Sequence, residues 1–186
     1  MKKLKEIPKF ISYLIFHWKA LGQLDRLWTS KEYLELISFC NTMLSKNSTD
    51  YLAFYYRGLA NEELNLFAES IEDFKKSSEM LSTYRLKSYA KWYFSRIPIQ
   101  ISRLYRKLQD KESAFDYADK AVQADKVEID SLKWRASLKE DFGDNMGALE
   151  DLNEALRRRP KDKATLKMRN RLTYIVIQDQ REKASR

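Results

Sequence analysis

YLAFYYRGLANEELNLFAESIEDFKKSSEMLS, residues 51–82, predicts two short amphipathic helices joined by a tight turn. Its pattern returns at 129–160, displaced by two 34-residue periods plus a ten-residue insertion. The matched residues are Phe54, Gly58, Ser70, Phe74 and Ser77 in the first copy and Leu132, Ala136, Ala148, Leu152 and Ala155 in the second. A 34-residue period of two helices is typical of a helical solenoid.

Small residues recur at three positions of each repeat. They allow neighbouring helices to approach within about 8–10 Å, where a bulky side chain would separate them. The first position holds Gly58, Ser102 and Ala136, the second Ser70, Ala114 and Ala148, and the third Ser77, Ala121 and Ala155.

This spacing resembles the tetratricopeptide repeat (TPR) family, in which small residues follow a large one in the first helix and a proline ends the repeat. The resemblance implies an all-α, right-handed superhelical array of antiparallel helix pairs with a C-terminal capping helix. Three departures are clear: only Pro160 fills the closing proline position, Asn61 and Lys139 replace the usual tyrosine of the first helix in two repeats, and Arg57 and Arg135 replace the usual leucine before the small residue.

We expect a single TPR-like domain over residues 1–186. Its predicted parts are repeats at about 17–50, 51–84, 95–128 and 129–162 and a capping helix at 163–183. The first repeat is weak, with helices predicted at about 8–28 and 30–47 and Ser30 as the N-cap of the second. Residues 85–94 interrupt the period. They either lengthen the next helix, which would run from about 85 to 108 with a kink at Pro98, or form a separate helix ending near Ile97.

Composition supports an all-α chain. Among 186 residues, 44% are hydrophobic and only four are glycine and three proline, so a core can form and the turn-rich composition of an all-β protein is missing. Cys40 is the single cysteine, which excludes an intramolecular disulfide and fits a reducing compartment. We therefore expect a cytoplasmic protein.

The net charge of +8 is distributed in alternating blocks. Counting Lys and Arg against Asp and Glu gives +3, −3, +7, −7 and +8 for residues 1–50, 51–82, 83–111, 112–156 and 157–186. Two interpretations stay open. Oppositely charged blocks would attract across repeat interfaces, or the two basic blocks would bind an anionic partner.

No catalytic or metal-binding pattern is present in the sequence. The one histidine, His17, lies in an apolar run without a second histidine or a nucleophile, and Cys40 is expected on an inward helix face. The apolar run ends well short of the ~20 residues that a membrane-spanning helix requires. We expect no enzyme activity and no cofactor.

The resemblance implies a concave groove lined by the first helices of successive repeats, which binds a protein or peptide. The groove residues carried over are Trp18, Trp28, Leu52, Tyr55, Leu59, Arg96, Ile99, Arg103, Arg106, Lys107, Lys133, Lys167 and Arg171, with Asp130 and Ser137 beside Lys133. Its centre is basic and its N-terminal part is apolar, which predicts a partner with acidic and large apolar residues.

Two further possibilities concern other partners. The basic blocks at 83–111 and 157–186, with their interleaved aromatic residues, could instead bind nucleic acid or an anionic membrane surface. A homodimer could also form through the N-terminal helix or the C-terminal cap, where the YIVI run at 174–177 leaves apolar residues without a predicted neighbour.

Overall fold

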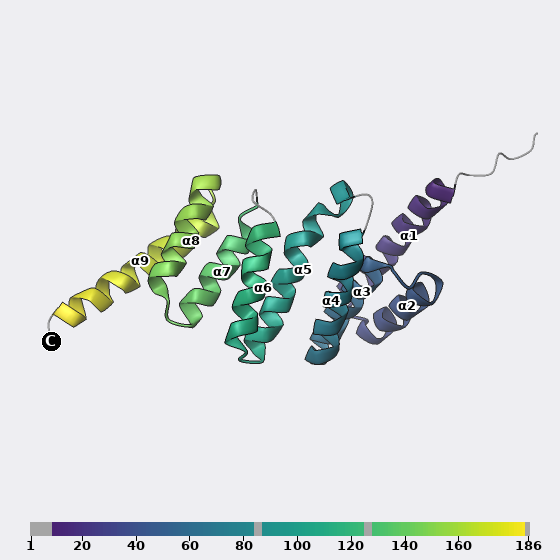
Figure 1. Cartoon of the computed structure of the whole chain (residues 1–186), viewed down its shortest axis with the longest axis horizontal. Coiled ribbons are helices and arrows are strands. Elements are labelled where there is room, and N and C mark those ends of the chain that lie inside the picture. Colours follow the sequence, from purple (N-terminus) through teal and green to yellow (C-terminus); the bar gives the residue numbers. More distant parts are fainter. Residues whose placement is uncertain (1–8, 84–86, 125–127, 185–186) are drawn as a thin grey trace, which may run out of the picture. The chain divides into compact units, whose positions relative to one another are not determined.

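The computed structural model describes the backbone of residues 9–83, 87–124 and 128–184, and the side chains of the same residues except 9–18 and 87–91. All regular secondary structure in these ranges is α-helical, which confirms the predicted fold class (Figure 1). The helices are α1 (Lys9–Thr29), α2 (Tyr33–Lys46), α3 (Tyr51–Glu63), α4 (Phe67–Thr83), α5 (Lys87–Lys107), α6 (Lys111–Ala124), α7 (Asp130–Asp141), α8 (Asn145–Arg158) and α9 (Lys163–Ala184).

The chain divides into two compact units, Met1–Ser82 and Thr83–Arg186. In the first unit α2 packs against α1 and α3. In the second, each of α5, α6, α7 and α8 packs against the next helix, and the first helices α5 and α7 also touch each other. The single domain over 1–186 and the right hand of the superhelix stay predictions.

The turn inside each repeat is built in the same way four times. Its central residue has a positive φ and recurs at intervals of 34, 44 and 34, which confirms the period and the ten-residue insertion. These residues are Lys31 (φ 59°), Asn65 (61°), Gln109 (61°) and Gly143 (82°). In the third turn the Asp110 amide donates to the Tyr105 carbonyl at 2.9 Å, the bond of a helix-ending Schellman turn. The first helix of each repeat therefore ends at the same position within the repeat.

The small residues at all three repeat positions are buried, as predicted. Three hydroxyls also hold the helix pairs together: Ser70 Oγ donates to the Gly58 carbonyl and Ser102 Oγ to the Ala114 carbonyl, both at 2.7 Å, and Ser77 Oγ donates to the Tyr51 carbonyl at 2.8 Å. At Gly58 an added Cβ would lie 3.1 Å from the Phe74 ring, so glycine leaves room for that ring. Small size is thus required by close packing of the two helices.

The predicted helix start at Ser30 is wrong. The Ser30 amide donates to the Arg26 carbonyl at 2.9 Å, so this residue lies in the turn that ends α1. Helix α2 begins at Tyr33, and Glu32 occupies its N-cap without a side-chain hydrogen bond. A serine before an apolar run resembles a cap, but the left-handed turn at Lys31 delays the start of the helix.

Residues 87–107 form one helix, α5, with Pro98 inside it. The lengthened helix is therefore confirmed and the separate helix ending near Ile97 is wrong. Pro98 removes one backbone hydrogen bond. Ile97, Ile99 and Ile101 around it are 0, 4 and 1% exposed, and their burial compensates for that loss. The kink stays a prediction.

Arg135 replaces the family's leucine because it binds three helices together. Its Nε and Nη2 donate to the two carboxylate oxygens of Asp151 on α8 at 2.9 and 2.6 Å, and Nη1 donates to Asp119 on α6 at 2.7 Å. Lys139 lies 3.1 Å from the same Asp151, whose side chain is 5% exposed. These hydrogen bonds raise the pKa of Arg135. We call these four residues the Arg135 cluster.

The same arrangement occurs in the first unit. Arg57 binds Asp73 with the same two nitrogens at 2.9 and 2.6 Å and Asn41 on α2 at 2.6 Å, while Asn61 donates to Asp73 at 3.0 Å. Every member of this Arg57 cluster is displaced from its counterpart in the Arg135 cluster by the same interval that separates the two copies of the sequence pattern.

The intervening repeat fills the corresponding positions differently. Ile101 is buried there, and the rings of Tyr105 and Tyr117 stack with their centroids 5.7 Å apart. The same position in the repeat therefore accepts either an ion-pair cluster or an apolar and aromatic one.

Candidate functional site

The second unit contains a pocket of about 310 Å³ between α5 and α7. Most of its lining was predicted for the groove: Arg96, Ile99 and Arg103 on α5, and Asp130, Lys133 and Ser137 on α7, together with Trp134. Residues spaced by three or four positions share one helix face, so each helix presents its part of the lining on a single side. The pocket thus brings together the first helices of two consecutive repeats.

Trp134 is the residue of this pocket that the sequence analysis missed. Its Nε1 donates to Ser102 Oγ at 2.7 Å, which fixes the indole against α5. The guanidinium carbons of Arg103 and Arg106 lie 5.1 and 5.5 Å from its ring centroid. Both cations are held over an aromatic face, a contact worth about 0.5–1 kcal/mol at an exposed site. The signal that could have found Trp134 is its place beside Lys133, a residue that was predicted.

Acidic side chains accompany the basic ones. Lys133 pairs with Asp130 at 2.8 Å, Arg106 with Asp141 at 2.8 Å, and Arg171 on α9 with Glu140 at 2.5 Å. The pairs of Arg106 and Arg171 join a basic sequence block to an acidic one, as the structural interpretation of the charge blocks predicts.

These ion pairs are partly open to solvent, because the Arg171 side chain is 57% exposed and that of Arg106 40% exposed. Exposed pairs of this kind contribute about 0–1 kcal/mol each. A carboxylate of a partner can therefore replace the internal one at little cost.

The start of the pocket is marked by Arg96, whose guanidinium carbon lies 4.8 Å from the ring centroid of Trp92. Trp92 is 51% exposed. A large apolar side chain therefore stands at the surface next to the basic residues. Lys107 on α5 and Lys167 on α9, also predicted for the groove, are both exposed.

The predicted groove residues of α3 need a correction. Leu52, Tyr55 and Leu59 are 3, 4 and 8% exposed, so they belong to the core and offer almost no surface to a partner. Helix α3 is apolar on most sides, and such a helix is buried nearly all round. Trp28 on α1 is half-buried with its ring centroid 5.7 Å from that of Tyr33. The side chain of Trp18 lies outside the described residues.

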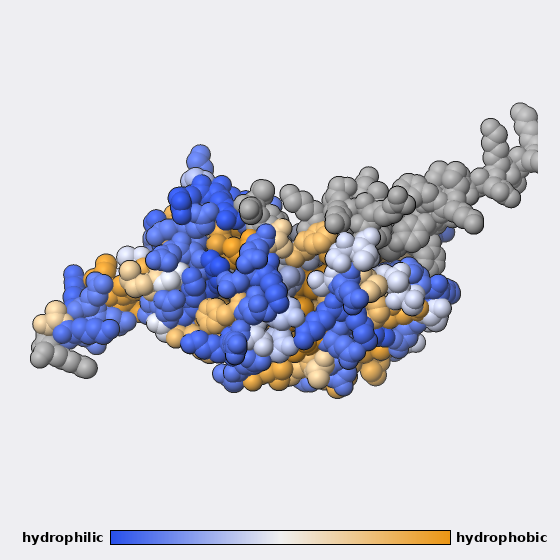
Figure 2. All heavy atoms as spheres, in the orientation of Figure 1, coloured by the Kyte–Doolittle hydropathy of each residue, from blue (hydrophilic) through white to orange (hydrophobic). Residues whose placement is uncertain are grey.

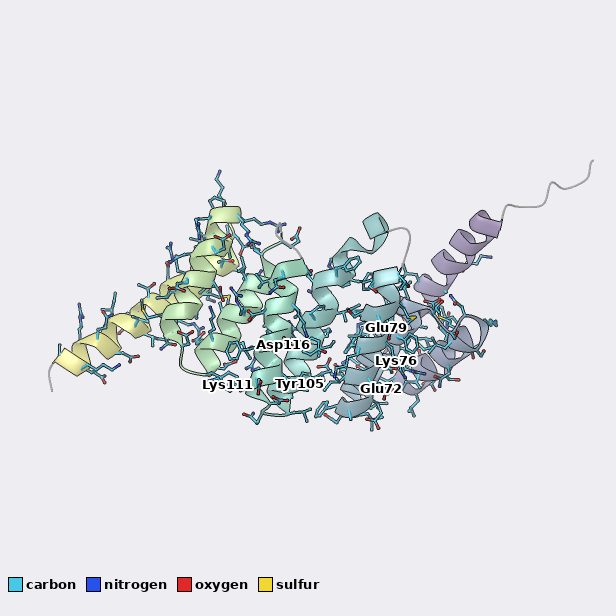
Figure 3. All side chains as sticks on the ribbon, viewed as in Figure 1. Glu72, Lys76, Glu79, Tyr105, Lys111 and Asp116 are labelled. Carbon is cyan, nitrogen blue, oxygen red and sulfur yellow. The ribbon has the colours of Figure 1, made fainter. Side chains whose placement is uncertain are left out.

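The outer faces of the second helices are different in character. On α4, Lys76 pairs with Glu72 at 2.7 Å (Figure 3). On α6, Lys120 pairs with Asp116 at 2.6 Å, and in each pair the two residues are four apart and about half exposed. Such pairs belong to solvated helix faces. The face seen in Figure 2 is largely hydrophilic, with apolar residues in separate patches.

The described residues contain no cluster of side chains that could hold a metal ion. None of the described helices is long and apolar enough to cross a membrane. Burial raises the pKa of the Cys40 thiol to about 12, so this cysteine is not a nucleophile at neutral pH. The side chain of His17 lies outside the described residues.

No family model matches the sequence, and no curated protein sequence matches it. Solved structures do. A fragment of MamA from Desulfovibrio magneticus RS-1 is 12% identical with a TM-score of 0.66, over 89% of this chain and 87% of that one. YrrB, described as a TPR protein with an unusual peptide-binding site, is 15% identical with a TM-score of 0.62, over 89% and 79%. The first TPR of Spaghetti (RPAP3), bound to the HSP90 peptide SRMEEVD, is 13% identical with a TM-score of 0.56, over 70% and 96%.

Proposed function

From the TPR-like fold that these structures share with the chain, we propose that the protein is a non-enzymatic adaptor or scaffold that binds a partner protein or peptide. The observation that carries the proposal is the pocket between α5 and α7, where Arg96, Arg103 and Lys133 surround Trp134. Two of the similar structures are described as binding peptides, which supports this class of ligand.

The partner we propose carries acidic residues next to a large apolar one. Its carboxylates would pair with Arg103 and Lys133, and its apolar side chain would pack beside the exposed Trp92. Charge-assisted hydrogen bonds to a guanidinium fix both position and orientation, so the order of acidic and apolar residues in the partner matters.

The test reverses two charges of this surface. Arg103→Glu together with Arg106→Glu is expected to abolish capture of partners by the tagged protein in an extract of its native host, while circular dichroism shows unchanged helical content. Lys76→Glu with Lys120→Glu is the matched control, since both lysines lie on the outer faces of second helices. Recovery of the same partners by the groove variant at the same yield would refute the assignment.

Nucleic acid or an anionic membrane is the competing ligand for the basic blocks. Arg106, Arg159 and Arg171 of these blocks pair with carboxylates of the chain itself, which argues against a surface that gathers phosphates. Binding to RNA or acidic liposomes that falls steeply with salt would favour that alternative.

The proposal also includes a cytoplasmic location and the possibility of a homodimer. The single buried cysteine supports the first. Tyr174 on α9 is 65% exposed and supports a contact through the cap. Light scattering of the purified chain tests the oligomeric state, and a monomer at all concentrations would exclude a stable dimer.

A further inference from the structure

Helix α9 occupies the place of the first helix of a fifth repeat. It begins after Asp162, whose carboxylate accepts a hydrogen bond from the Thr165 amide at 2.8 Å and caps the helix. Thr165 and Leu172 are 0 and 1% exposed, as are Ser131 and Leu138 (1 and 0%), which lie one repeat period earlier on α7. Helix α9 therefore packs toward the preceding repeat as α7 does.

The other face of α9 has no helix against it among the described residues. On α7 this face is covered by α8, and Leu132 and Ala136 are each 1% exposed. Their counterparts on α9 are Leu166, which is half-buried, and Asn170, which is exposed. The last turns of α9 extend beyond α8 (Figure 1). We call this surface the open face of α9, and it consists of Leu166, Arg169, Asn170, Thr173 and Ile177.

Arg169 shows what kind of helix fits this face. It lies one repeat period after Arg135, and Asn153 on α8 has the same place in its repeat as Asp119 and Asn41, the partners of Arg135 and Arg57 on the preceding helix. In both complete clusters the arginine also binds an aspartate of its own second helix. Arg169 instead donates to Oδ1 of its neighbour Asn170 at 2.9 Å. The position is thus equipped for a carboxylate that the described part of the chain does not supply.

The second helices that cover such faces share a pattern. Helix α4 has Ser70, Asp73, Phe74 and Ser77, and α8 has Ala148, Asp151, Leu152 and Ala155, that is, a small residue, an aspartate three later, a large apolar residue next to it and a second small residue three further on. The small residues let the helices approach, and the aspartate reaches the arginine.

We propose that the open face of α9 binds one amphipathic helix of a partner protein that carries this pattern, with its aspartate on Arg169 and its apolar residues on Leu166, Thr173 and Ile177. The charge of Arg169 and the exposed apolar surface beside it argue for such a helix over a purely apolar or a basic one. This surface is separate from the pocket between α5 and α7, so the proposal goes beyond the function proposed above.

The probe is a fluorescein-labelled peptide of residues 144–159, which carries the pattern of α8, titrated with the full chain and followed by fluorescence anisotropy. We expect saturable binding, and a loss of roughly tenfold for the same peptide with D151N, because asparagine has no negative charge and only one acceptor oxygen for the Arg169 guanidinium. Both peptides lose the same conformational entropy on binding, so the ratio of their affinities reports the carboxylate alone.

Variants of the chain locate the contact. Arg169→Gln is expected to weaken binding of the unmodified peptide by the same factor and to leave binding of the D151N peptide unchanged, whereas Arg181→Gln has no effect. Circular dichroism checks that each variant keeps its helical content.

Three results would overturn the proposal. One is the absence of saturable binding. The second is equal binding of both peptides, or full binding by Arg169→Gln. The third is a dimer in light scattering that Ile177→Asp dissociates without peptide, which would assign the open face to a second copy of this chain.

Discussion

Replacing Asp151 with leucine removes the carboxylate that joins α7 to α8. Its side chain is 5% exposed and that of Arg135 is 22% exposed, so the guanidinium loses two hydrogen bonds in a largely dry place. Breaking a buried pair from one side costs about 3–5 kcal/mol. Because Arg135 keeps Asp119 and Lys139 keeps the Gly147 carbonyl, we expect a loss of about 2–4 kcal/mol in the free energy of unfolding.

The double variant separates the ion pair from the packing. Arg135→Leu alone leaves Asp151 paired with Lys139. We expect it to lower the free energy of unfolding by about as much as Asp151→Leu does. Arg135→Leu with Asp151→Leu replaces both charges with apolar groups, a change that is often neutral, so we expect a loss of about 0–2 kcal/mol, well below the sum of the single variants. In the intervening repeat, the position that corresponds to Arg135 holds the buried Ile101, so this position can accommodate an apolar residue.

Urea unfolding followed by circular dichroism measures these losses, and hydrogen exchange of α7 and α8 amides reports the same free energies locally. With a slope of about 2 kcal/mol per molar urea, each single variant lowers the midpoint by about 1–2 M. Asp116→Leu on α6 is the control, because its pair with Lys120 is half exposed and its loss costs less than about 0.5 kcal/mol. Single variants within that margin, or a double variant equal to their sum, would refute the reasoning.

Three other predictions concern local features. Gln109→Gly is expected to raise the free energy of unfolding by about 0.5–1 kcal/mol in the same urea assay, since φ is 61° there, whereas Leu108→Gly lowers it. Cys40 is buried with its pKa raised to about 12, so mass spectrometry should find its alkylation by iodoacetamide at least ~100-fold slower in the folded protein than in urea; equal rates would contradict this. Hydrogen bonds from Thr165 lower the pKa of Asp162 below 3.8, so the Asp162 carboxylate stabilises the start of α9 above that pH. The melting temperature of the Asp162→Ala variant should therefore approach that of the unmodified protein as pH falls below 3.8. A difference in melting temperature that stays constant with pH would contradict this prediction.

The repeat period could be predicted because its signals are local. Small residues such as Ala114 and Ala148 mark where helices cross, and the sequence shows their spacing directly. The turn residues Lys31 and Gln109 give no such signal, because neither favours a positive φ. Their conformation follows from the way the preceding helix ends, so Ser30 was assigned to the wrong helix.

The candidate site could be predicted only in part. The resemblance to TPR proteins implies which faces of α5 and α7 line the groove, and Arg96, Arg103 and Lys133 were expected there on that ground. Leu52 on α3 was misplaced because the resemblance gives the position of a residue in its repeat but not how many sides of its helix are covered. The aspartate partner of Arg135 could have been predicted, since Asp73 and Asp151 occupy the same place in the two copies, as Arg57 and Arg135 do.

The two arginine environments of this chain have different consequences for binding. Arg135 has its three nitrogens committed to two carboxylates, one of them nearly buried, and exchanging these for a partner's carboxylate would break the joint between α7 and α8. Arg106 has a half-exposed aspartate and an aromatic face, and an incoming carboxylate can replace the first while the second holds the guanidinium in place. Net charge therefore overstates the attraction for anions. In the proposed function, a partner is therefore selected by carboxylates that reach the basic residues around Trp134, and this selection requires geometry as well as charge.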